Sequence, residues 1–237
     1  MMALFVMGMS SQPDIDTLLL HFDSVTFGNE FTKERFPRVR KWKNSIRIGV
    51  QGDAPEFLDA DIRQHVGELK HLTGHPVDLV YSEPMRKAGM VPKGFDTREV
   101  NVIVFFIPRE KIHASVMKYF NNDSNEVDRM IASSTCFAKF FKKQDEIRAA
   151  VVVIPSHLSR EEVRACVVEE LTQVMGLPND SERVTQSVFN DKSRFNELTR
   201  YDRAMVHVLY DDRMRLGMPR DEALVLARTL LEKELEF

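Results

Sequence analysis

The sequence lacks several features that assign other chains to a class at once. No apolar run is long enough to cross a bilayer as a helix, which needs about 20 residues, and only two of the 237 residues are cysteines. The formal net charge is −3, from 33 basic and 36 acidic residues, and short basic clusters such as residues 38–43 are balanced by acids elsewhere. We therefore expect neither a transmembrane segment nor a nucleic-acid partner.

Histidines in a metal-binding pattern are also missing. The pair at helical spacing, His71 and His75, is interrupted by Gly74, which is a helix-ending residue. A catalytic zinc usually takes three histidine or carboxylate ligands and keeps one position open for water. We expect the seven histidines to be structural or exposed: His21, His65, His71, His75, His113, His157 and His207.

The most informative pattern lies in residues 159–180. Ser159 followed by Glu162 has capping-box spacing and predicts a helix that runs to about Met175. Within that helix and just beyond it, the chain reads Glu-Glu-Leu-Thr-Gln-Val-Met-Gly-Leu-Pro-Asn over residues 169–179.

This stretch resembles the metzincin zinc-protease signature H-E-x-x-H-x-x-G-x-x-H. The general-base glutamate is matched by Glu170 and the turn glycine by Gly176, but Glu169, Gln173 and Asn179 replace the three zinc-binding histidines. Residues four apart share a helix face, so Glu169 and Gln173 are expected to point toward one cleft. The resemblance implies a zincin-like fold whose zinc site has been lost.

Two alternatives remain open for the substituted site. Carboxylate and amide oxygens suit magnesium, calcium or manganese better than zinc, so a remodelled metal site is one alternative. The favoured one is a metal-free site without a cofactor, in which Gln173 and Asn179 hydrogen-bond to other polar groups. Glu170, with Glu169 beside it, is then either the general base of a hydrolase or the partner of a basic side chain such as Arg194 or Arg203. Asp180, Asn190 and Asp191 have two interpretations. Either they supply oxygens for a calcium-like site, or they are ordinary turn and cap residues.

The remaining pattern predicts an α+β fold. Alternating Ile46, Ile48 and Val50 indicate a strand, and the apolar runs 100–107 and 147–155 indicate central strands. Helices are expected at about 14–30, 53–73, 109–120 and 219–235, the second of them capped by Asp53. The segment 126–146 is ambiguous. We divide the chain into an N-terminal extension, residues 1–44, with a helix and a candidate signal remnant at 1–9, and a zincin-like domain, residues 45–237.

Features after the motif extend the resemblance. Ser187-Val188-Phe189-Asn190 lies where metzincins have their Met-turn, with Phe189 in place of the methionine, and residues 198–210 are similar to the matrixin C-terminal helix. The resemblance implies a mixed sheet with an active-site-type helix, a Met-turn-like loop and C-terminal helices.

The chain is also similar to a family of proteobacterial exported proteins and lipoproteins of unknown function. The residues that carry this similarity are Cys166, Glu169–Leu171, Gln173, Gly176, Asn179–Asp180, Ser187–Asp191, Leu198–Thr199, Asp202, Leu209–Asp211 and Gly217–Met218.

That resemblance implies an exported protein of the bacterial cell envelope, located in the periplasm or attached to the envelope. An exported character favours a disulfide between Cys136 and Cys166 over two buried free thiols. The expected function is a non-catalytic module that binds or assembles with an unknown protein or cell-envelope partner. The alternative is a hydrolase that uses Glu170 with Glu169, without metal or with a metal other than zinc.

Overall fold

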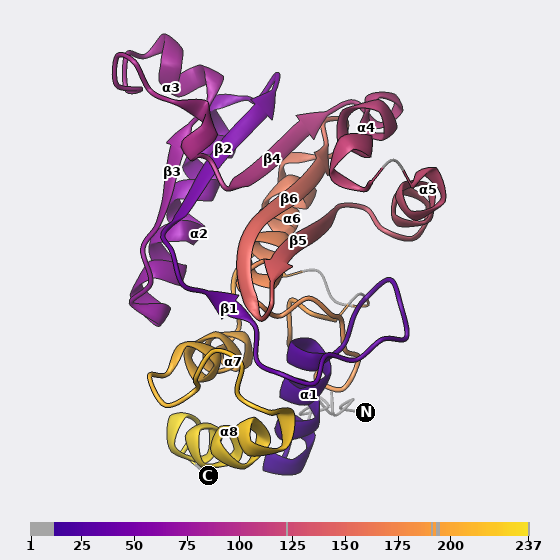
Figure 1. The fold of residues 1–237 in the computed structure, drawn as a ribbon, viewed down its shortest axis with the longest axis vertical. Helices are drawn as coiled ribbons and strands as arrows, with labels where there is room; N and C mark the ends of the chain where they lie inside the picture. The colour runs from indigo at the N-terminus through magenta and orange to yellow at the C-terminus, as the bar shows by residue number, and fades with distance from the viewer. Residues whose placement is uncertain (1–11, 122, 191, 193–194, 237) are drawn as a thin grey trace, which may run out of the picture.

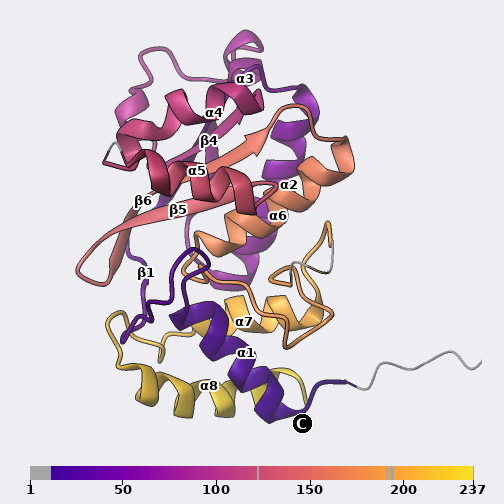
Figure 2. The same ribbon diagram turned by 90° about the vertical axis from the view of Figure 1, so that its right-hand side faces the viewer.

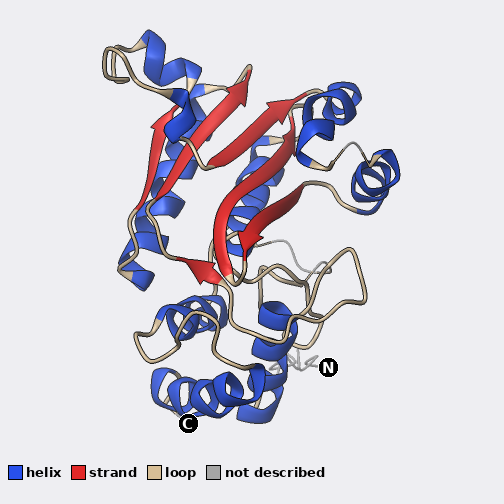
Figure 3. Cartoon of the chain, viewed as in Figure 1, coloured by secondary structure: helices blue, strands red, loops and turns tan. Residues whose placement is uncertain are grey.

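The computed structural model describes residues 12–121, 123–190, 192 and 195–236. Its centre is one mixed sheet in the order β1-β6-β4-β2-β3, with β5 antiparallel to β6 (Figures 1 and 3). The strands are β1 (Lys41–Trp42), β2 (Ile46–Gly52), β3 (Val77–Tyr81), β4 (Val102–Ile107), β5 (Phe137–Lys143) and β6 (Glu146–Pro155).

Strand β6 is the central strand in the half of the sheet next to the motif helix. It runs parallel to β4, with Val102 opposite Ala150 and Phe105 opposite Val153. Antiparallel β5 lies on its other edge and, within the described residues, pairs with β6 alone. Strands covered on both faces become continuous apolar runs, which explains the sequence Ala150–Ile154 of β6.

Helices cover both faces of the sheet, as Figures 1 and 2 show. Successive side chains of β4 point to opposite faces. Val104 and Phe106 therefore join the larger core, whereas Phe105 and Ile107 join a smaller one. The larger core includes α2 (Glu56–Thr73) and α6 (Arg160–Gln173). The smaller one includes α4 (Arg109–Val116), η2 (Met117–Tyr119) and α5 (Ser124–Ser133).

A group of helices lies below the sheet in Figure 1: α1 (Ile15–Phe27), α7 (Arg200–Tyr210) and α8 (Arg220–Glu234). Leu18, Phe22 and Val25 of α1 are fully buried and belong to the same apolar cluster as the sheet. Trp42 of β1 also joins this cluster, and its Nε1 donates to the carbonyl of Val174 at 2.8 Å. The N-terminal segment thus shares its core with the rest of the chain, although it precedes the boundary predicted at residue 44.

The predicted α+β class is confirmed, and the structure differs from the elements predicted from the sequence only locally. Helix α2 begins after Pro55, which has no side-chain capping bond, so the predicted Asp53 cap is wrong. Residues 83–99 contain the short helices α3 (Glu83–Lys87) and η1 (Thr97–Glu99), and the ambiguous segment 126–146 contains most of α5 and all of β5. No described helix combines the length and apolar character that crossing a bilayer requires. The predicted signal remnant at 1–9 lies outside the described residues.

Candidate functional site

Helix α6 carries the motif, and its predicted capping box is confirmed. The N–H of Glu162 donates to Ser159 Oγ at 3.3 Å, and the N–H of Ser159 donates to Glu162 Oε2 at 3.0 Å. The helix ends at Gln173, two residues before the predicted end. Gly176 follows with φ +123°, and a Cβ there would collide with the carbonyl oxygen of Arg40. Only glycine suits this turn, which directs the chain away from α6.

A disulfide joins Cys166 of α6 to Cys136, which immediately precedes β5. Their Cα atoms are 6.0 Å apart, and the predicted pairing is confirmed. The bridge ties the motif helix to the start of the antiparallel edge strand. It lies one helical turn before Glu169 and Glu170, so these two carboxylates are fixed relative to β5.

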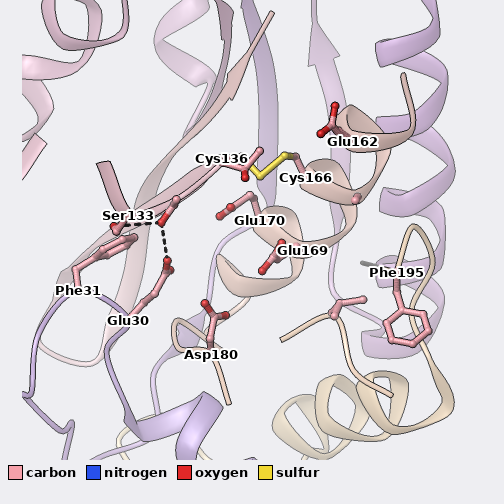
Figure 4. A pocket seen from close by; sticks show the side chains of 14 residues that line it. Glu30, Phe31, Ser133, Cys136, Glu162, Cys166, Glu169, Glu170, Asp180 and Phe195 are labelled. Carbon is pink, nitrogen blue, oxygen red and sulfur yellow. Dashed lines mark hydrogen bonds between the residues drawn. A yellow bond between two sulfur atoms is a disulfide. The ribbon is translucent and has the colours of Figure 1, made fainter. Parts of the chain in front are cut away.

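Beside the disulfide lies a cavity of about 330 Å³ (Figure 4). Its wall is formed by the segments around residues 30–31 and 133–136 and by one face of α6. Glu169 is half-buried, and Glu170 is only 3 % exposed. Among the lining residues that the structure describes, none is basic and five are acidic: Glu30, Glu162, Glu169, Glu170 and Asp180.

Gln173 and Asn179, the other two positions that replace histidines of the metzincin signature, hydrogen-bond within the protein. Gln173 Nε2 donates to Asp180 Oδ1 at 2.9 Å. Asn179 Nδ2 faces the end of α1, where Ser24 offers its carbonyl oxygen at 3.1 Å and its hydroxyl at 3.2 Å, and it also lies 2.7 Å from the carbonyl of Asp180. Glu169 borders the cavity, whereas the side-chain nitrogen of Asn179 is turned toward the end of α1.

Of the basic partners and extra oxygens expected near Glu170, Asp180 lines the same cavity, and the others lie elsewhere or outside the description. Arg203 Nε donates to Glu68 Oε1 at 2.7 Å. The side chain of Asn190 donates to the carbonyl of Val184 at 3.0 Å, as a turn residue does. Arg194 and Asp191, the remaining candidates, lie outside the described residues.

The segment predicted to resemble a Met-turn forms a buried turn. The N–H of Asn190 donates to the carbonyl of Ser187 at 3.3 Å. Phe189 is fully buried, with its ring centroid 6.2 Å from that of His21. Val188 lines the same cavity as Glu169, so the turn and the motif helix form neighbouring parts of one wall.

Sequence inspection missed the group that holds this turn, the buried carboxylate of Asp202. Its Oδ1 accepts from Ser187 Oγ at 2.6 Å, and its Oδ2 accepts from the N–H of Val188 at 3.2 Å and from the N–H and hydroxyl of Thr199 at 2.8 and 2.7 Å. Burial raises the pKa of the Asp202 carboxyl, and these hydrogen bonds oppose the rise. The Thr199-x-x-Asp202 spacing is a capping signal that could have identified the helix start, but it gives no sign of the contact with Ser187.

Ser187, His21 and Asp202 do not form a catalytic triad. The Ser187 hydroxyl proton goes to Asp202, so His21 Nε2, 3.2 Å away, must donate to Ser187 Oγ. In a triad the histidine stands between serine and carboxylate and accepts the serine proton. Burial, helped by the charge of Arg183, lowers the pKa of His21 to about 4. This cluster therefore serves to position the turn.

Comparison with protein families gives a match over most of the chain. The family is described as a protein of unknown function, DUF2927, and its model covers residues 16–229. No curated protein matches the chain. Because the match spans nearly the whole sequence, the chain belongs to the DUF2927 family, whose function is unknown.

Proposed function

We propose that this chain is a zincin-like module of the bacterial cell envelope that has lost zinc chemistry and uses the cavity beside α6 to bind another protein. The observation that carries the proposal is the state of the former ligand positions. Gln173 and Asn179 use their amide groups to hold Asp180 and the end of α1. Hydrogen bonds of this kind stabilise the loop after α6 and support a structural role for these two positions.

The arrangement of elements supports the zincin-like assignment. Helix α6 directly follows β6, the last strand of the sheet in sequence, as the resemblance to metzincins requires. The turn at 187–190 reaches the same cavity through Val188, and α7 follows it. An exported protein is also the type in which a disulfide such as Cys136–Cys166 persists.

The chemistry of the cavity favours one class of partner segment. Its described lining contains five carboxylates and, at the rim, the hydroxyl of Ser134, which donates to Glu30 at 3.1 Å. A segment that carries lysine or arginine complements such a surface and associates faster at low salt. The partner is therefore expected to present positive charge to the cavity.

Site-specific photo-crosslinking in cells tests this proposal. A photoreactive residue at exposed Ser133, on the cavity wall, should capture one defined envelope protein. The matched control is the same residue at Thr229, an exposed position of α8 outside the cavity lining. Identical products from both positions, or no product from Ser133, would contradict a binding role for the cavity.

One observation favours a second candidate function. Carboxylate oxygens of Glu169 and Glu170 lie within 4.8 Å of each other beside an open cavity. Paired carboxylates are a common arrangement for general acid–base chemistry, which supports a hydrolase without zinc. Peptide or ester cleavage by the purified chain that disappears in Glu170→Gln, with the fold intact, would establish this candidate. A chain that cleaves none of these substrates, or a Glu170→Gln variant with full activity, would remove Glu170 from consideration.

A further inference from the structure

Sulfur and carboxylate ligand atoms meet at one point of the cavity wall. Cys136 Sγ and one carboxylate oxygen from each of Glu169 and Glu170 all lie within 4.8 Å of one another. Cys166 Sγ is bonded to Cys136 Sγ, so it adjoins this group of three ligand atoms. Figure 4 shows the disulfide with Glu170 and Glu169 directly below it.

The local structure fixes this grouping. Cys166, Glu169 and Glu170 stand at i, i+3 and i+4 of α6, which places them on one helix face. Cys136 reaches them from the segment before β5. Three of the four side chains are nearly fully buried, with exposed fractions of 7 % for Cys136, 3 % for Cys166 and 3 % for Glu170. The fourth, Glu169, borders the cavity and gives the cluster access to solvent.

We propose that the dithiol form of this chain binds one zinc-class divalent cation through Cys136, Cys166, Glu169 and Glu170. In the oxidised protein both sulfurs are committed to the disulfide and cannot act as thiolate ligands. Reduction by a phosphine breaks the S–S bond: phosphorus takes up the oxygen of one water molecule, and the two protons of that water go to the two sulfurs. The cation then displaces both thiol protons, which are released to solvent. Disulfide formation and metal binding are thus mutually exclusive states of the same residues.

The ligand set suits a cation of this class. Thiolates select borderline or soft metals such as zinc, and zinc takes four tetrahedral ligands at about 2.3 Å from sulfur and 2.0–2.2 Å from carboxylate oxygen. Tetrahedral geometry places two zinc-bound sulfurs about 3.8 Å apart. The cysteine Cα atoms, 6.0 Å apart, leave room for the bonded sulfurs to separate once the bridge is cut. Only Glu169 belongs to the former metzincin ligand positions, so this site differs from the lost one and does not depend on the proposed binding role.

Cobalt binding by the reduced full chain tests the proposal. Protein treated with a water-soluble phosphine under anaerobic conditions is titrated with Co²⁺, whose tetrahedral thiolate complexes absorb through sulfur-to-metal charge transfer and visible d–d bands. We expect one equivalent of Co²⁺ to develop these bands, and zinc to displace it. The oxidised chain should develop neither band.

Substitutions distinguish the assembled site from a simple dithiol chelate. Glu169→Gln and Glu170→Gln should each weaken Co²⁺ binding by roughly tenfold or more. Glu30→Gln is the matched control, because Glu30 lines the same cavity but lies outside the ligand cluster, and it should bind Co²⁺ as the wild type does. If reduction unfolds the chain, the thiols will bind Co²⁺ equally well in all three variants, and that result refutes the proposal. Absence of thiolate charge transfer in the reduced wild type, or its presence in the oxidised protein, refutes it as well.

Discussion

Removing the disulfide should cost about 3.6 kcal/mol of folding stability. The bridge closes a loop with a sequence separation of 30 residues. For a loop of this length, the chain-entropy relation −2.1 − 1.5R ln n cal/mol/K gives about 3.6 kcal/mol at 25 °C. The loop contains all of β5 and β6, so the crosslink restricts the unfolded chain in the half of the sheet that borders the cavity.

Urea unfolding of a Cys136→Ala/Cys166→Ala double variant measures this cost. The fluorescence of Trp42 is a suitable probe, because this single tryptophan is buried in the core. The transition should move to lower urea, and the m-value should rise because the uncrosslinked unfolded chain exposes more surface. In a domain of this size the melting temperature should fall by roughly 7–14 °C.

Two controls accompany the measurement. Wild-type protein kept reduced in the presence of a chelator should unfold close to the double variant. Native oxidised protein should not react with a thiol reagent, because both described cysteines are bridged. A stability difference below about 1 kcal/mol with an unchanged m-value would refute the loop-entropy reasoning.

Three further outcomes follow from buried groups and backbone geometry. Asp202→Asn should destabilise by about 2–3 kcal/mol in urea unfolding, because an amide nitrogen in place of one carboxyl oxygen cannot accept the hydrogen bonds that this oxygen receives; exposed Asp221→Asn is the control, and equal effects would contradict the role of Asp202. Burial lowers the pKa of His21 to about 4 and that of His65 to about 3. In the unfolded chain both histidines gain a proton near pH 6.5, so the free energy of unfolding should be highest above that pH and should fall as the pH drops toward 4. A His21→Gln variant should lose part of this dependence of stability on pH, and an unchanged dependence would exclude His21 as its source. Gly176→Ala should cost about 1–3 kcal/mol, since it forces a Cβ against Arg40 at φ +123°. Gly67→Ala, in α2 with open space around it, should instead stabilise slightly, and equal melting temperatures for these two glycine variants would contradict the strain argument.

Local signals in the sequence predicted the elements that carry the motif. The Ser159–Glu162 capping box marked the start of α6 because both capping bonds form within four residues. The apolar run of β6 indicated a strand covered on both faces. By contrast, Asp53 failed as a cap because Pro55 occupies the N-cap position and α2 begins at Glu56.

Contacts between distant segments could not be predicted. Strand β5 is recognisable only by its pairing with β6, since its sequence, Phe-Ala-Lys-Phe-Phe-Lys-Lys, shows no regular alternation of apolar and polar residues. His21 and Ser187 are 166 residues apart, and Asn179 meets Ser24 across 155 residues. No local pattern encodes such pairs, so the hydrogen bonds of Asn179 with Ser24 emerge only in the folded chain.

Elemental analysis of the native, oxidised protein, purified without added metal or chelator, tests the loss of zinc chemistry most directly. Histidine is missing from positions 169, 173 and 179, and the amides at two of them hydrogen-bond internally. We predict far less than one zinc per chain and a melting temperature that does not change when a chelator is added, since a bound metal would contribute folding free energy. One zinc per oxidised chain, or a large loss of stability on chelation, would contradict the account.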